Sequence, residues 1–543
     1  MPSPSHVAYR NFVLKWFRFH ADKPDVAAQL QVHGEAALVL WELDLEAARP
    51  VLKRGYAKHP RGGNPWDPLV LLRCLLLTAL LRKPQINSFV PDLKADRTLC
   101  VLCGIDPDGR HPGVGTLYDF LHRLHNGPLC DCPCGHRMSP ATLERRRAAT
   151  PRPRNIKPKR TETKAEKRER LRRRDNDPVT AKAAVSSSAT KQLCESLRAA
   201  NEQQNPEDQL ERLAEILLEV SVVKSAKMGL LGSLDKLVAC GDGSALPTGA
   251  SRHGKRSCSC TRSARCECPR IYHDPDAAIG YDSYRERYFF GHHIYELCVS
   301  SQGHDLPLHL RLDPGNESDF TASLKALDRL RKLLRHSHPE MTIRYLVQDA
   351  GHDGENNYRF PLEQDILPVI PLSKDAPATH PMRPELNLSS RGVPLCKAGI
   401  EMAPWGSAGK SRRLFACPVK AGFVKRCPLA PDDDPSWLCR PGAAMAPVVN
   451  LSIEQNPRLC PPVPRNSALH EELYNLRSGC ERSFSAKKTC FNLEAARHCR
   501  KSFWLTRLYL MAVLQHAKAW VANGDPTALV DHLLGRTRKQ AAA

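Results

Sequence analysis

The sequence from Tyr288 to Gln348 decides the fold of the larger part of this 543-residue chain. Two stretches rich in apolar, aromatic and β-branched residues, YFFGHHIYELCVS at 288–300 and LPLHLRL at 306–312, predict neighbouring strands. The stretch TASLKALDRLRKLLR at 321–335 predicts an amphipathic helix, and TIRYLVQ at 342–348 predicts a further strand. Strands that alternate with helices in this way indicate an α/β fold.

The segments on either side extend this pattern. KLVACGD at 236–242 predicts a strand that ends at Asp242, a short helix is expected near 354–364, and ILPVIP at 366–371 predicts another strand. A final helix is expected at 471–490, after an irregular stretch at 373–465 that is rich in Pro and Cys. The order of three strands, helix, strand, helix, strand and late helix resembles the RNase H-like fold, a mixed sheet flanked by helices.

The chain is strongly basic. It has 80 Lys and Arg against 58 Asp and Glu, a net charge of +22 and a pI near 9.3, which favours a polyanionic partner and nucleic acid before membrane. Aromatic residues make up only 6%, which argues against a single-strand binder built on stacking platforms. The first 20 residues lack the pattern of a signal peptide, and the longest apolar stretch, 69–81, is too short to span a bilayer. We therefore expect neither a secreted nor an integral membrane protein.

The charge is concentrated at residues 137–174. This segment holds 16 Lys or Arg against four Glu, a net +12, in a Pro-broken and apolar-poor sequence. Such density suits an arm that follows phosphates, with Arg145, Arg146, Arg147, Arg172, Arg173 and Arg174 as candidate DNA-binding residues. The alternative is a solvated linker.

Four parts of the chain are predicted from these patterns. They are a helical DNA-binding domain at 1–136, a basic linker at 137–190, an RNase H-like catalytic domain at 191–505 with the inserted subdomain 373–465, and a C-terminal helical tail at 506–543. Three short helices between Trp66 and His125 suit a helix-turn-helix-like unit, and an ordinary helical bundle is the alternative.

Three acidic residues are candidate metal ligands. Asp242 and Asp349 directly follow predicted strands, and Glu481 lies on the predicted last helix. Small residues follow each Asp, so the backbone is free to turn away while the carboxylate faces the end of the sheet. Carboxylates that converge there suit two Mg²⁺ ions in phosphoryl transfer. Asp353 competes with Asp349 for the second position, and its place further from the strand disfavours it.

Glu481 belongs to a stripe with three other polar residues. Tyr474, Arg477, Glu481 and Lys488 fall within about 60° of one another on a continuous helix. A phenol, two cations and a carboxylate on one face suit contact with phosphates and metal, and make Tyr474, Arg477 and Lys488 candidate DNA contacts. The alternative is a solvated face on which Arg477 simply pairs with Glu481.

The spacing Tyr-x2-Arg-x3-Glu-x6-Lys at 474–488 resembles the signature around the third acidic residue of DDE-type transposases of bacterial insertion sequences. Asp242 and Asp349 match the first and second acidic positions of that family, and the long interval before Glu481 is similar to members with an insertion domain. The helical region near 66–124 is similar to the family's N-terminal domain. The basic stretch 137–174 departs from the family pattern in being more pronounced.

This resemblance implies a transposase that binds the terminal inverted repeats of its own element, cleaves DNA strands and joins the freed 3′-OH to target DNA. Asp242, Asp349 and Glu481 would hold Mg²⁺ or Mn²⁺. The expected partners are double-stranded DNA, at the element ends and the target, and a second copy of the chain in a paired-end homodimer. We expect a cytoplasmic, nucleoid-associated protein with no membrane partner.

The chain has 21 cysteines and no secretory signal, so metal binding or reduced thiols are expected rather than disulfides. Cys258, Cys260, Cys266 and Cys268 form two C-x-C motifs within 11 residues and are candidate ligands of a structural zinc, with tolerated reduced thiols as the alternative. Two functions of other classes also remain. One is a catalytically silent, transposase-derived DNA-binding regulator, and the other is a zinc-stabilised RNA-binding protein.

Overall fold

The computed structural model describes residues 5–20, 23–56, 65–126, 181–199, 209–256, 270–374, 377–409, 411–430, 448–496 and 498–535. The N-terminal part of the chain is helical. Its helices are α1 (His6–Phe19), α2 (Pro24–Glu42), α3 (Ala48–Lys53), α4 (Pro68–Leu80), α5 (Ile86–Ala95), α6 (Arg97–Cys103) and α7 (Val114–Asn126). Asp67 caps α4 by accepting a hydrogen bond from the N–H of Leu69, and Pro68 occupies its first turn.

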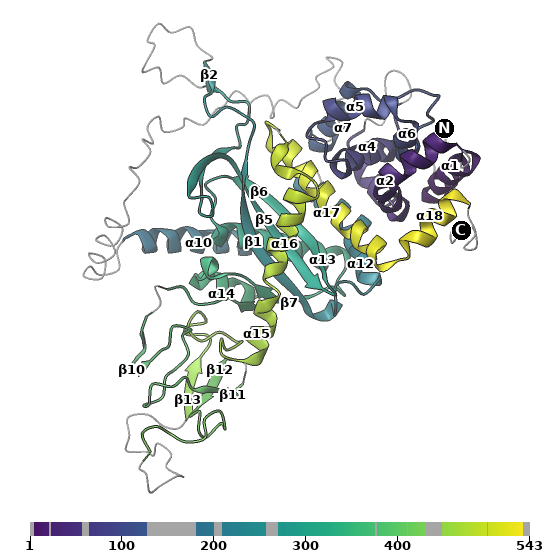
Figure 1. Ribbon diagram of the computed structural model, residues 1–543. Coiled ribbons are helices and arrows are strands. Elements are labelled where there is room, and N and C mark those ends of the chain that lie inside the picture. The colour runs from purple at the N-terminus through teal and green to yellow at the C-terminus, as the bar shows by residue number, and fades with distance from the viewer. Residues whose placement is uncertain are drawn as a thin grey trace.

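A six-stranded mixed sheet forms the centre of the molecule (Figure 1). Its strands are β1 (Leu237–Pro247), β4 (Ala278–Asp282), β5 (Arg287–Ser301), β6 (His304–Pro314), β7 (Ile343–Val347) and β8 (Leu367–Val369). β5 pairs antiparallel with β1, β4 and β6, whereas β7 is parallel to both β1 and β8. The core order β6-β5-β1-β7-β8 is the mixed sheet predicted from the sequence, and the fold is RNase H-like.

One predicted strand boundary is wrong. The sequence predicts that the first strand ends at Asp242, but β1 continues to Pro247 and places Asp242 in its middle. The reason is the length of β5, which has 15 residues and pairs with β1 from Cys240 to Pro247. Asp242 is therefore held by ladder pairing on one side, while β7, which ends at Val347, leaves its other side open.

The helices that follow the N-terminal region include several that cover the two faces of the sheet. They are α10 (Ala181–Ala199), α11 (Gln209–Leu217), α12 (Val223–Lys227), α13 (Asp319–Ser337), α14 (Glu355–Leu362), α15 (Ala468–Asn475), α16 (Ser478–Thr489), α17 (Lys501–Asn523) and α18 (Pro526–Leu534). Short helical turns lie at Leu218–Val222, Leu234–Lys236, Ala350–His352 and Leu493–Ala495. α16 and α17 pack on the face that carries Asp242, and α13 begins on the opposite face.

The N-terminal helices share one hydrophobic core with the sheet and the C-terminal helices, since a single buried cluster extends from Tyr9 to Leu534. α2 and α4 pack against α17, and α1 packs against α18 beside both chain ends (Figure 1). The predicted boundary at 505/506 falls inside α17. Among the residues of α7 whose side chains are described, only Gly115 is exposed, because α7 contacts α4, α5, α11 and α17.

The described residues between β8 and α15 form five short strands in two small sheets, at the bottom of Figure 1. They are β9 (Thr379–His380), β10 (Arg383–Asn387), β11 (Ala403–Ser407), β12 (Arg412–Ala416) and β13 (Val448–Ser452). They enclose a core of their own, which includes Leu386, Phe415 and Leu451. The remaining strands, β2 (Lys255–Arg256) and β3 (Arg270–Ile271), form a separate two-stranded ribbon.

The helix predicted at 471–490 is two helices. α15 ends at Asn475 and α16 begins at Ser478, with i→i+3 bonds from the N–H of Leu476 and of Arg477 at the junction. Close contact fixes this break: a methyl group on Gly479 would lie 2.7 Å from Ser300 Cβ and 2.8 Å from an Asp305 oxygen. The start of α16 is thus pressed against the β5–β6 turn.

Candidate active site

Asp242 is placed on β1 between two glycines that make room for side chains on the opposite face. A Cβ at Gly241 would overlap the hydroxyl of Tyr295, and a Cβ at Gly243 would overlap the Asp319 carboxylate and the His293 ring. The glycines therefore allow these groups to approach β1 closely. The expectation that small residues after Asp242 let the backbone turn away is wrong, because β1 continues through them.

The surroundings of Asp242 destabilise the ionised form of its carboxyl group. Burial raises its pKa to about 6, the negative charges of Asp349 and Asp319 add to this rise, and the N–H of Gly243 opposes it. Asp349 and Asp319 thus lie close enough to Asp242 to repel its ionised form. A carboxyl in this position gains from any cation brought near it.

Asp349 follows β7 and caps the short helical turn that begins at Ala350. It accepts a hydrogen bond from the N–H of Gly351 at 3.0 Å, and His352 Nδ1 lies 2.6 Å from the same oxygen. Burial acts to raise the pKa of Asp349, but the hydrogen bond and charge of His352, the Gly351 N–H and Arg477 together lower it. This carboxylate is therefore held ionised, as a metal ligand requires.

His352 is oriented by a buried chain of side chains. Its Nε2 lies 3.1 Å from the hydroxyl of Tyr295, which in turn accepts a hydrogen bond from Gln348 Nε2 at 2.6 Å. His352, Tyr295 and Gln348 are all fully buried. The Tyr295 hydroxyl thus holds one ring nitrogen of His352 while the other, Nδ1, points at Asp349.

Asp353 does not belong to this cluster. Its carboxylate lies within 3.0 Å of both Arg458 nitrogens that contact it, and it also accepts hydrogen bonds from the N–H of Ser373 and the hydroxyl of Tyr358. These bonds tie α14 to the segments on both sides of the insertion. Asp353 is thus a structural carboxylate, which agrees with the preference for Asp349 over Asp353.

Glu481 lies on the first turns of α16, with its side chain 53% exposed. One carboxylate oxygen is 2.7 Å from Arg477 Nη1, the i,i+4 pair that the sequence offered as the alternative to a metal ligand. The guanidinium of Arg477 also lies 5.7 Å from the centre of the Tyr474 ring. The charge of Arg477 lowers the pKa of Asp349, and the charge of Asp242 acts on Arg477, so Arg477 lies near both aspartates as well as Glu481.

Lys488 lies at the other end of α16. Its Nζ is 3.2 Å from Ser244 Oγ and 3.9 Å from Glu494. Ser244 is two residues beyond Asp242 and on the same face of β1. Of the predicted stripe, Lys488 thus contacts β1 beside Asp242, and the charge of Arg477 acts on Asp349 and responds to Asp242. Tyr474 and Glu481 are placed by their contacts with Arg477.

A buried polar network fixes α16 to the sheet. Lys487 Nζ is 2.7 Å from Glu296 and 2.6 Å from Gln515 of α17, and both Lys487 and Glu296 are fully buried. Ser483 donates to the other Glu296 oxygen, and Glu296 pairs directly with Asp242 across the β1–β5 ladder. Sequence reasoning missed these residues, because their only signal was a charged residue, Glu296, within an apolar strand.

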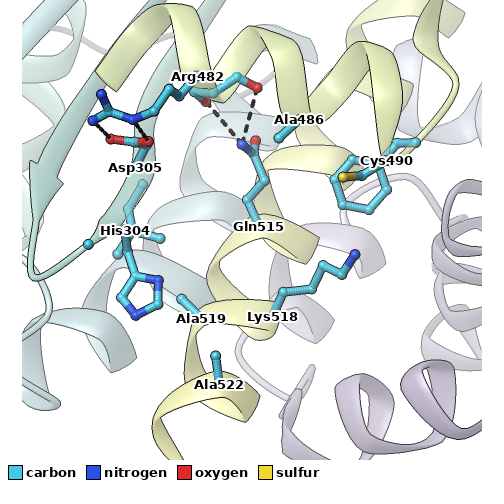
Figure 2. A pocket seen from close by; sticks show the side chains of 13 residues that line it. His304, Asp305, Arg482, Ala486, Cys490, Gln515, Lys518, Ala519 and Ala522 are labelled. Carbon is cyan, nitrogen blue, oxygen red and sulfur yellow. Dashed lines mark hydrogen bonds and ion pairs between the residues drawn. The ribbon is translucent and has the colours of Figure 1, made fainter. Parts of the chain in front are cut away.

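A cavity of about 280 Å³ lies beside this network, between the β5–β6 turn, α16 and α17. Figure 2 shows Gln515 bonded to α16, and Arg482 paired with Asp305 at its rim. Lys518, His304 and Cys490 also line the cavity. Asp242, Asp349 and Glu481, here called the acidic cluster, do not line this cavity.

The donor chemistry of the acidic cluster fits hard divalent cations, because Asp242 and Asp349 repel each other and present only oxygen ligands. Among the described residues, however, no group of three His, Cys, Asp or Glu side chains is arranged to hold a metal ion. Glu481 is turned to Arg477 instead. The two aspartates fit the expected ions, and the third ligand would have to leave Arg477.

Some predicted site residues lie outside the described part of the chain. They are Arg145, Arg146, Arg147, Arg172, Arg173 and Arg174 of the basic segment, and Cys258, Cys260, Cys266 and Cys268 of the expected zinc site. Within the described ranges, no helix is long and apolar enough to cross a membrane.

Comparison with known proteins identifies part of the chain. No curated protein and no solved structure shows a significant match. Residues 269–514 match the family model described as the transposase DDE domain. The match includes Asp349 and Glu481, whereas Asp242 precedes it. It agrees with the resemblance found at residues 474–488 and with the RNase H-like sheet, and residues 269–514 belong to the DDE transposase family.

Proposed function

We propose that this protein is a transposase that binds the terminal inverted repeats of its own insertion sequence, cleaves DNA strands there and transfers the 3′-OH to target DNA. Asp242, Asp349 and Glu481 are its catalytic residues. The observation that carries this proposal is the match of residues 269–514 to the transposase DDE domain, together with the placement of Asp242 on β1 and of Asp349 just after the adjacent parallel strand β7.

In this proposal the chain's own residues prepare the site. His352 holds the Asp349 carboxylate in one orientation, and the ladder partner Glu296, tied to Lys487, keeps α16 in register with β1. Two Mg²⁺ or Mn²⁺ ions held by Asp242, Asp349 and Glu481 would supply activation of the attacking oxygen and stabilisation of the leaving oxygen.

Arg477 has a second role in this scheme. When the negative charge of a DNA phosphate approaches, the guanidinium can exchange the Glu481 carboxylate for a phosphate oxygen, which frees Glu481 to turn to the aspartates. Lys488 offers a second cation at the other end of α16. Among the described residues, its Nζ contacts only Ser244 and Glu494. Tyr474 supports Arg477 by ring contact.

Sequence-independent affinity is assigned to the basic linker at 137–190, through its arginines at 145–147 and 172–174. Joining two element ends requires two active sites, so a homodimer is the minimal assembly on double-stranded DNA. The domain division at 136, 190 and 505 and the structural zinc at Cys258, Cys260, Cys266 and Cys268 belong to the same proposal.

The test compares Glu481→Gln with Asp242→Asn and Asp349→Asn in two assays, binding to the element end and Mg²⁺-dependent strand cleavage. Each nearly isosteric change removes one negative charge, so binding should persist while cleavage falls by at least about a hundredfold. Glu472→Gln is the matched control, because Glu472 is an exposed carboxylate on the neighbouring helix α15.

Two outcomes would contradict the proposal. Cleavage by Glu481→Gln within a few-fold of wild type would remove Glu481 from the site and leave its pair with Arg477 as a surface contact. Binding of the element end by wild-type protein without cleavage in Mg²⁺ or Mn²⁺ would favour the catalytically silent regulator.

A further inference from the structure

The hairpin of β4 and β5 ends in three exposed tyrosines. Tyr281, Tyr284 and Tyr288 are 55%, 94% and 56% exposed. Tyr281 and Tyr288 face each other across the ladder, with their rings 5.2 Å apart in an edge-to-face arrangement. A group of large aromatic side chains on one exposed tip usually marks a surface that binds another molecule.

The tip is well ordered by its own turn. The Asp282 carboxylate accepts hydrogen bonds from the N–H groups of Tyr284 and Arg285, each at 3.1 Å. Glu286 adopts a left-handed conformation, with φ of 49°, which closes the turn. The tyrosines are thus presented on a preformed ribbon and lose little further freedom on contact.

Side-chain contacts connect this tip to the acidic cluster. Arg285 Nη2 lies 2.7 and 3.0 Å from the two carboxylate oxygens of Glu494, and Glu494 is 3.9 Å from Lys488. Lys488 in turn contacts Ser244, which is close to Asp242 on β1. The hairpin therefore lies beyond the C-terminal end of α16, and this chain of side-chain contacts connects it with the part of β1 that carries Asp242.

The distance from the hairpin to the level of Asp242 follows from the geometry of β5. Glu296 pairs with Asp242, and Tyr288 lies eight residues earlier on β5. At about 3.4 Å per residue, Tyr288 lies up to about 27 Å along β5 from the level of Asp242. B-DNA rises about 3.4 Å per base pair, so a duplex that runs parallel to β5 covers this length in about eight base pairs.

The exposed area is too small for a stable protein interface. The three tyrosines together expose about as much as two whole side chains, which amounts to roughly 400 Å². A standard interface buries about 800 Å² on each partner. Bases, by contrast, stack on single aromatic rings, and the net charge of +22 favours a polyanion over a second copy of this basic chain.

We infer that the β4–β5 tip is a second DNA contact, in which Tyr284, with Tyr281 and Tyr288, stacks against bases about eight base pairs from the scissile phosphate. This inference rests on the proposed function. Bases in a duplex are already stacked, so the contact opens one base step. Unstacking a step costs an energy of the order that one or two tyrosine–base stacks return, and one inserted ring stacks on the bases on both sides of it.

The experiment uses the full chain and element-end duplexes that carry 2-aminopurine at single positions from four to twelve base pairs from the cleavage site. Binding of wild-type protein should raise 2-aminopurine fluorescence near position eight. Tyr284→Ala should abolish this rise and weaken binding about tenfold. Tyr284→Phe, which keeps the ring, should restore both. Phe423→Ala is the control, because Phe423 is another strongly exposed aromatic residue, at 71%, and belongs to the insertion.

The outcomes separate this inference from the proposed function. An unchanged fluorescence profile in Tyr284→Ala, with normal Mg²⁺ cleavage, overturns the tip contact alone. If Tyr284→Ala changes the oligomeric state but changes neither the fluorescence nor the DNA affinity of each protomer, the tip is a protein interface and the proposed DNA contact is overturned. A wild-type chain that neither binds nor cleaves the element end overturns both. Asp242→Asn should keep the fluorescence rise while losing cleavage.

Discussion

The buried pair of Lys487 and Glu296 allows a sharp prediction of stability. Both side chains are fully buried, and the Lys487 ammonium has Glu296, Ser483 and Gln515 as its partners. Lys487→Met removes the ammonium and leaves the Glu296 carboxylate buried with only the Ser483 hydroxyl. Breaking one side of a buried pair costs about 3–5 kcal/mol, a large fraction of the 5–15 kcal/mol typical of a whole domain.

The double variant Glu296→Gln/Lys487→Met distinguishes this cost from lost packing. With both charges removed, no ion stays buried without a partner, so most of the loss should be recovered. The measurement is the free energy of unfolding from urea titrations of the two single variants and the double variant, which gives a coupling of about 2 kcal/mol or more. Lys488→Met is the control, since the partly exposed Lys488 should cost less than about 1 kcal/mol.

Two results would refute this reasoning. If Lys487→Met costs less than about 1 kcal/mol, the Lys487 ammonium does not compensate a buried carboxylate. If the double variant loses the sum of both single losses, the two side chains act independently and the network does not hold α16 on β5.

Two further predictions concern the acidic cluster and the basic segment. The pKa of Asp242 is raised from 3.8 to about 6, so the folded state binds this proton more tightly than the unfolded chain, and stability falls as pH rises from about 4 through 6, by roughly 2–3 kcal/mol. In metal-free buffer, Asp242→Asn should remove this pH dependence from unfolding curves, and an identical profile in both proteins would contradict the assigned burial. Replacing the arginines at 145–147 and 172–174 with Ala should weaken binding to any duplex and flatten its salt dependence by up to ~0.9 log–log units per lost phosphate contact, and an unchanged slope would make the segment a linker.

The sequence predicts the sheet well because its strands are apolar and its long amphipathic helix is strongly periodic. β5, β6, α13 and β7 all lie within one or two residues of their predicted bounds. Local composition could not predict where β1 ends, because that depends on the length of its partner β5. The surroundings of Asp242, which include Tyr295, His293 and Asp319, depend likewise on contacts between residues distant in the chain.

The two interpretations of Glu481 could not be separated by sequence, because spacing i,i+4 serves an ion pair and a shared ligand site equally well. The structure shows the ion pair, and the strength of that pair decides whether Glu481 can leave it. Glu481 is more than half exposed, and exposed i,i+4 pairs contribute only about 0.3–0.5 kcal/mol. Asp242, by contrast, bears a pKa raised by burial and by two neighbouring carboxylates, which favours the arrival of positive charge. The weak pair at Arg477 is therefore easily exchanged, which supports the proposal that Glu481 leaves Arg477 when a DNA phosphate binds there.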